Sequence, residues 1–349
     1  TDLEGKPTTG KILVAGTTEP YNGVDHWEPS LASSPDGNIA IAWWKRLHQY
    51  DGSRWLYNEN VWFAVLNSSG GIVKPATRIT SNNNFTEWGA NGMAFYDSVS
   101  VASTANNQFV VAWMKEVDGG STWSSDVEYA VVNSAGGIVR GLTLYSNAPD
   151  RSQGNANDPV VSRLNNGQVL LAFADGDVQY CILSNNGDVL QPQRELTVNG
   201  YPNYIDAAPV AGSNVLFTWY RFVSLGYEIE YAVVNADSGF VVKGQTTTPM
   251  LGDVGGYGTA IAPLPGQGAV VTWGAYDDSW LGAMTVNGQG DIISPPTIFR
   301  RLSFEALAAG MTIGRADFAH HNAPIAKLPT TQLKSDPLLT SSVNSGGPQ

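Results

Sequence analysis

The sequence has one cysteine, few charged residues and no long apolar run, and each scarcity excludes a class of protein. With Cys181 as its only cysteine, the chain of 349 residues forms no internal disulfide. Lys and Arg number 19 against 31 Asp and Glu, and the net charge of -12 argues against nucleic acid and anionic membrane surfaces as partners. No run approaches the roughly 18 apolar residues of a membrane helix. Only 14% of residues are charged, which is unlike a helical protein, whereas 42% are hydrophobic, enough for a sizeable core.

What the sequence does contain is five copies of one unit. Each copy has an apolar run ending in an aromatic residue, preceded by a short strand and followed by a second apolar strand, a turn with Gly or Asn, and a third strand. The five runs are 38–43, 108–113, 168–173, 214–219 and 268–273. Their aromatic ends are 70, 60, 46 and 54 residues apart, against the roughly 40–50 residues of a propeller blade, with the excess in loops. The repeat predicts an all-β fold, a β-propeller of five four-stranded blades, or of six with one divergent blade.

The two ends do not follow the repeat. We expect an N-terminal segment 1–23, a propeller 24–303 and a C-terminal extension 304–349. The expected blades are 24–86, 87–147, 148–199, 200–250 and 251–303. Residues 10–16 match the outermost strand of a unit, so the chain has one outer strand too many. That strand completes a sixth blade, adds a fifth strand to one blade, or pairs with a neighbouring molecule through Ile12, Leu13 and Val14. The Pro-, Ser- and Thr-rich extension is expected to dock on its own propeller or on a neighbour.

The repeat also explains the lone cysteine. Cys181 occupies the position that Ala64, Ala130, Ala232 and Ala283 fill in the other units. We therefore expect a small, buried and unreactive side chain.

One turn resembles a known family. Ser34-Pro35-Asp36-Gly37 is similar to the Asp-box turn of sialidase-type (BNR) repeats from exported bacterial proteins, although its Gly falls one place early. The resemblance covers about residues 24–300 and implies a propeller and export; no sialidase arginine triad is identified. The Asn-, Ser- and Gly-rich, Lys-poor composition also resembles exported proteins, and the chain begins at Thr1 with no signal-peptide pattern. We expect a protein processed after export, located outside the cell or at its surface.

Acidic and aromatic residues are predicted to share one face of the propeller. Loops that enter the innermost strands carry Asp25, Glu28, Asp97, Asp158 and Asp206. Loops between the second and third strands carry Trp55, Trp123, Phe222, Tyr227 and Trp280. Aromatic faces stack on sugar rings and carboxylates accept hydroxyl hydrogen bonds, so Trp55, Trp123, Tyr227, Trp280 and Asp97 form the predicted ligand-binding set. The alternative is that the aromatic residues pack between blades and the acids cap turns.

A glycosidase is the sharpest enzymatic interpretation. Asn157-Asp158-Pro159 resembles the nucleophile motif of five-bladed glycosidases. The resemblance implies that Asp158 is a nucleophile or base, with Glu28 or Asp206 as its partner.

No metal or cofactor is predicted. His26, His48 and the pair His320-His321 lack zinc spacing. Calcium would draw on Asp175, Asp177, Asp277 and Asp278, which do not supply enough oxygen ligands. Asn67 and Asn84 match the glycosylation acceptor pattern.

Three functions follow, in order of preference. The first is a non-catalytic extracellular structural protein, which assembles with copies of itself into a filament or surface layer through the surplus strand or the extension. The second is a lectin-like propeller with glycans as partners, disfavoured because the loops differ from blade to blade. The third is the glycosidase.

Overall fold

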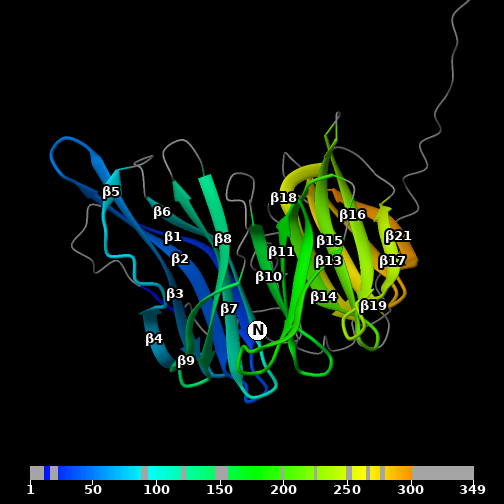
Figure 1. Cartoon of the computed structure of the whole chain (residues 1–349), viewed down its shortest axis with the longest axis horizontal. Coiled ribbons are helices and arrows are strands. Elements are labelled where there is room, and N and C mark those ends of the chain that lie inside the picture. The colour runs from blue at the N-terminus through cyan, green and yellow to red at the C-terminus, as the bar shows by residue number, and fades with distance from the viewer. Residues whose placement is uncertain are drawn as a thin grey trace, which may run out of the picture.

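A computed structural model describes residues 12–15, 23–87, 93–118, 123–145, 156–196, 198, 200–223, 226–248, 254–264, 268–275 and 280–300. Within them, all regular structure is β-strand, arranged as five antiparallel sheets that follow one another along the chain (Figure 1). We call these sheets blades one to five. The predicted all-β propeller is confirmed in this part of the chain, and no sixth sheet occurs among the residues described.

Each blade is a meander whose strands pair in sequence order from the innermost to the outermost. Blade one has β1 (Gly23–Ser33), β2 (Ile39–Tyr50), β3 (Trp55–Leu66), β4 (Ile72–Arg78) and a short β5 (Thr86–Glu87) paired with β3. Blade two has β6 (Ala94–Ser103), β7 (Gln108–Asp118), β8 (Trp123–Asn133) and β9 (Ile138–Leu144). Blade three has β10 (Asn157–Arg163), β11 (Val169–Asp175), β12 (Asp177–Leu183) and β13 (Val189–Leu196). Blade four has β14 (Pro202–Pro209), β15 (Asn214–Val223), β16 (Gly226–Asn235) and β17 (Val241–Thr247). Blade five has β18 (Val254–Leu264), β19 (Gly268–Ala275), β20 (Trp280–Val286) and β21 (Ile292–Arg300).

The turn between the third and fourth strands shows why the repeat folds as it does. In blade one, the Asn67 side-chain oxygen accepts hydrogen bonds from the N–H groups of Ser69 and Gly71. Gly70 has a φ of 81°, a left-handed backbone that glycine adopts without steric cost. Asn67 therefore caps a turn, and its predicted glycosylation, like that of Asn84, stays a prediction.

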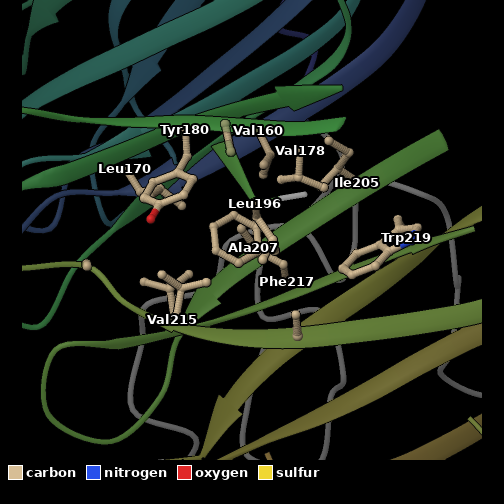
Figure 2. Close-up of a cluster of buried hydrophobic side chains, with 14 of the residues drawn as sticks. Val160, Leu170, Val178, Tyr180, Leu196, Ile205, Ala207, Val215, Phe217 and Trp219 are labelled. Carbon is tan, nitrogen blue, oxygen red and sulfur yellow. The ribbon is translucent and has the colours of Figure 1, made fainter. Parts of the chain in front are cut away.

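The core lies between blades. Four clusters of buried apolar side chains each join two consecutive blades. In the cluster between blades three and four, the Tyr180 ring of blade three lies 5.6 Å from the Phe217 ring of blade four, centroid to centroid (Figure 2). The next cluster toward the N-terminus contains Cys181, which is buried as predicted, and burial raises the pKa of its thiol to about 12. Because side chains alternate between the two faces of a strand, blades two, three and four use both faces to pack against their neighbours.

Blades one and five are the ends of this series. In the three middle blades, the second strands β7, β11 and β15 are buried on both faces. In blade five, the second strand β19 alternates between buried and half-buried residues. Half-buried Val270 and Thr272 lie on the face of blade five turned away from blade four, and half-buried Ile39 and Ile41 lie on the corresponding outer face of blade one. Among the described residues, no apolar cluster joins blade five to blade one.

The N-terminal outer strand predicted at 10–16 is not found where the structure describes it. Residues 12–15 form no strand; Ile12 lies against Gly70 at the turn of blade one, and Leu13 is 76% exposed. The C-terminal extension lies outside the described residues. No helix long and apolar enough to cross a membrane occurs in the part described.

Candidate functional site

The inner strand of every blade is interrupted at the same place. In each blade, the pairing of the inner strand with the second strand shifts in register at one point. The inner strands are β1, β6, β10, β14 and β18. One residue at each interruption has a positive φ; these residues are Glu28 (48°), Ser98 (51°), Asp158 (49°), Tyr204 (52°) and Gly258 (100°). A left-handed backbone at a residue other than glycine costs on the order of 1–2 kcal/mol, so it persists only where its surroundings fix it. Bulges of this kind redirect side chains and are common beside active sites.

Hydrogen bonds join the interruptions of blades one to four. The Ser98 N–H donates to Glu28 Oε2 at 2.9 Å, and the Ser98 hydroxyl donates to Asp158 Oδ1 at 3.0 Å. The Tyr204 N–H donates to Asp158 Oδ2 at 2.8 Å. Two carboxylates from blades one and three therefore meet at one serine of blade two. The Ser98 N–H also lies 2.6 Å from Asp97 Oδ1, which adds a third carboxyl group. We call Glu28, Asp97, Ser98, Asp158 and Tyr204 the carboxylate centre.

Further carboxyl groups surround this centre. Glu59 forms an ion pair with Arg46 at 2.6 Å and accepts the Tyr96 N–H at 3.0 Å. Burial raises the pKa of Glu59, and the negative charge of Asp97 raises it further, whereas the positive charge of Arg46 opposes this rise. Burial, followed by the charge of Asp97, also raises the pKa of Glu116. Carboxyl groups whose pKa is raised thus lie near the hydrogen-bonded carboxyl groups of the centre, and differences of this kind between neighbouring carboxyl groups are what acid–base chemistry uses.

Asp206 lies two residues beyond the interruption of blade four and is fully buried. Its Oδ2 accepts the Ile261 N–H of blade five at 2.6 Å, and its Oδ1 accepts the Ala207 N–H at 2.8 Å. Ser30 and Ser100 make the same connection at this register position, accepting the N–H groups of the next inner strands. Burial raises the pKa of Asp206 to about 7. We infer that Asp206 joins blades rather than serving the centre.

The predicted aromatic residues are only partly described. Trp55 is 46% exposed at the start of β3, next to Tyr50 and His48, and Phe222 is 67% exposed on β15. Trp123, Tyr227 and Trp280 lie at the beginnings of β8, β16 and β20, but their side chains fall outside the described set. Asp25 Oδ2 lies 2.7 Å from His48 Nε2.

No metal cluster of three or more His, Cys, Asp or Glu side chains occurs in the described part of the chain. Asp177 accepts the Val198 N–H at 2.8 Å, while Asp277 and Asp278 are not described.

Sequence reasoning missed Ser98, Tyr204 and the Arg46–Glu59 pair. Ser98 and Tyr204 are not acidic, and their importance comes from their place at the interruption. Aligning the inner strands of all five units places them in register with Glu28 and Asp158, which is the one signal available in the sequence.

Fold and site together define a β-propeller with carboxyl groups gathered where its inner strands are interrupted. No protein-family model matches the sequence, and no curated protein does. Among solved structures, the NanB sialidase of Streptococcus pneumoniae is similar with a TM-score of 0.59 and 8% identity, over 86% of this chain and 65% of the sialidase chain. A mutant of the same sialidase gives a TM-score of 0.57 at 8% identity, over 82% and 63%. An endo-arabinase from Bacteroides thetaiotaomicron gives 0.38 at 11% identity, over 78% and 93%.

The likeness to the sialidase establishes the fold, and the chain covers less than two thirds of that protein. The expected non-catalytic, self-assembling structural protein is contradicted by this comparison, since the solved structure that is similar with a TM-score of 0.59 is a sialidase. The error has a physical origin. The carboxyl groups that meet in space come from three separate inner strands, so no compact motif in the sequence indicates them.

Proposed function

We propose that the protein is a glycoside hydrolase whose reaction takes place at the carboxylate centre, with Glu28 and Asp158 as the two reacting groups. One observation carries the proposal: these carboxylates, from blades one and three, both accept hydrogen bonds from Ser98 of blade two. A pair of carboxyl groups on either side of a glycosidic bond is the usual requirement for its hydrolysis. The sialidase-like fold supports the same class of reaction.

The hydrogen bonds of Asp158 indicate its role. Both oxygens of Asp158 accept hydrogen bonds, from the Ser98 hydroxyl and the Tyr204 N–H, and such donors stabilise the charged carboxylate. We assign Asp158 as nucleophile or base and Glu28 as the acid. In the reaction Glu28 gives its proton to the departing oxygen as the C–O bond breaks. Asp158 either attacks the anomeric carbon or takes a proton from the attacking water.

The test is a hydrolysis screen with the full chain. Fluorogenic 4-methylumbelliferyl glycosides, including a sialoside and an arabinofuranoside, are incubated with the wild type, Glu28→Gln and Asp158→Asn. We expect cleavage of at least one glycoside, and each substitution to lower kcat/KM by about 10²–10⁴-fold. Asp188→Asn is the matched control, because Asp188 is an exposed carboxylate in the turn before β13 and is paired with Arg140 of β9.

Two results would overturn the proposal. One is wild-type rates in both Glu28→Gln and Asp158→Asn. The other is no cleavage of any glycoside; glycan binding without cleavage would then leave a lectin-like function in its place.

A further inference from the structure

One face of blade one carries a continuous row of aromatic side chains beyond the core. Register pairs Trp27 with Trp44, Asp25 with Arg46, and Gly23 with His48 between β1 and β2. It also pairs His48 with Tyr57 and Tyr50 with Trp55 between β2 and β3. Paired residues at alternate positions share a face of the sheet. The row lies on the face turned toward blade two, because Trp44 also belongs to the core cluster between these blades. We call Trp27, Trp44, Tyr57, His48, Trp55 and Tyr50 the aromatic strip.

Ring contacts connect the strip from one end to the other. The Trp27 ring stacks on Trp44 with centroids 5.8 Å apart and planes at 12°. The Arg46 guanidinium lies 5.0 Å from the Trp44 ring and 5.8 Å from the Tyr57 ring. His48 contacts Tyr57 at 5.3 Å and Trp55 at 6.4 Å between centroids. Rings at both ends of the strip remain accessible to solvent: Trp27 is 49%, Tyr50 47% and Trp55 46% exposed.

The hairpin that carries the strip is held in place. Blade one is the blade with a fifth strand in the described structure, and β5 pairs with β3 at Leu56 and Tyr57. Arg54 at the hairpin forms an ion pair with Glu87 of β5 at 2.7 Å. The buried Asn58 amide donates to the backbone oxygens of Asn82 and Asn84 at 3.0 and 2.8 Å. A fixed aromatic surface loses little conformational entropy when a ligand binds, which favours affinity.

The strip begins beside the carboxylate centre, since Trp27 directly precedes Glu28 in β1. From Trp44 to Tyr50 the strip follows seven residues of β2, a length of about 20 Å. A single sugar ring is much shorter than this. The half-exposed rings of Trp27, Tyr50 and Trp55 offer apolar surface for sugar rings to stack on. In the register of the strands, Asp25, Arg46 and His48 lie between these rings, where their polar groups match the hydroxyl groups of linked sugars.

We propose that the aromatic strip binds a glycan chain of several linked sugars, so that the substrate of this protein is an oligosaccharide or polysaccharide rather than a single glycoside. The inference rests on the proposed function for its choice of ligand, but it concerns binding outside the carboxylate centre. The competing occupant is a second protein surface, because exposed aromatic patches also mediate protein association.

Affinity gel electrophoresis tests the strip without relying on hydrolysis. Asp158→Asn protein is run through gels containing soluble arabinan, xylan, mannan, β-glucan or polysialic acid, with Trp55→Ala or Tyr50→Ala added in the same background. We expect at least one polysaccharide to retard the Asp158→Asn protein, and each added substitution to weaken its affinity by about tenfold or more. The matched control is Phe240→Ala. Phe240 is 69% exposed in the turn before β17, at the opposite end of the strands from the aromatic strip. We expect this substitution to leave retardation unchanged.

The outcomes separate this inference from the proposed function. Retardation that persists in both Trp55→Ala and Tyr50→Ala, or no retardation by any polysaccharide, overturns the glycan strip. Self-association in sedimentation velocity that is lost in Trp55→Ala, without glycan binding, assigns the strip to a protein partner instead and also overturns it. Glycan binding through Trp55 in a wild-type protein that cleaves nothing supports the strip while the proposed function fails.

Discussion

Replacing Asp206 by asparagine is expected to change how the stability of the propeller depends on pH. Asp206 is fully buried between blades four and five, and burial raises its pKa from 3.8 to about 7. A carboxyl whose pKa is raised by folding binds its proton more tightly in the folded state. Its contribution is therefore fully present below pH 4 and is lost as the pH rises through about 7.

The size of the effect follows from the shift. A rise in the pKa of Asp206 from 3.8 to about 7 corresponds to about 4 kcal/mol of unfolding free energy, at about 1.36 kcal/mol for each tenfold change in proton affinity. The wild type is expected to lose up to this amount between about pH 4 and pH 8 through Asp206 alone. The amide introduced by Asp206→Asn does not titrate, but it accepts only one of the two N–H groups, from Ile261 or Ala207, that the carboxyl accepts. That loss costs about 1 kcal/mol at every pH.

The assay is urea unfolding of the wild type and Asp206→Asn at several pH values across this window. The stability advantage of the wild type is predicted to be largest at the acidic end and to shrink or reverse at the alkaline end. Taking the difference between the two proteins removes the contribution of every other titrating group. An Asp188→Asn variant, at an exposed carboxylate, serves as the control. A constant difference between wild type and Asp206→Asn would refute the assignment of Asp206 as a buried carboxyl that gains a proton on folding.

Three further predictions follow from individual contacts. Ser98→Ala removes the hydroxyl donor to Asp158 but keeps the N–H donor to Glu28. We expect kcat to fall by about tenfold and the unfolding free energy to fall by only about 1 kcal/mol. An unchanged kcat would contradict the role of Ser98 as the donor that the two carboxylates share. Gly282→Ala would place a methyl group 2.3 Å from the Trp273 ring. We expect urea titrations to show an unfolding free energy lowered by about 1–3 kcal/mol. Wild-type stability would contradict the close approach of the Trp273 ring to Gly282. Cys181 is expected to resist iodoacetamide until the protein is unfolded, as measured by mass spectrometry, and rapid labelling of native protein would show that it is accessible.

The fold was largely predictable because the repeat encodes it locally. Apolar runs ending in Trp43, Trp113, Phe173, Trp219 and Trp273 specify strands buried against neighbours, and Asn and Gly specify the turns between them. The same alignment predicted that Cys181 is buried, since a position filled by alanine elsewhere leaves little space. These features depend on contacts close in sequence or repeated in every blade.

The site was less predictable because it depends on how blades meet. Glu28 and Asp158 were predicted in loops that enter the inner strands, whereas they lie within β1 and β10. Their common hydrogen-bond donor belongs to another blade and is a serine. Asp206 was grouped with them by residue type, although its register position matches the linking residues Ser30 and Ser100. The positive φ at each interruption has no single sequence signature, because glutamate, serine, aspartate, tyrosine and glycine all occur there.

The most direct test of the account is the stereochemistry and rate of glycoside cleavage in wild type, Glu28→Gln and Asp158→Asn, followed by proton NMR of the released sugar. The account predicts cleavage by the wild type with one anomer formed first, and a loss of about 10²–10⁴-fold in each variant. Hydrolysis that continues at the wild-type rate in both variants would contradict the assignment of the carboxylate centre as the active site.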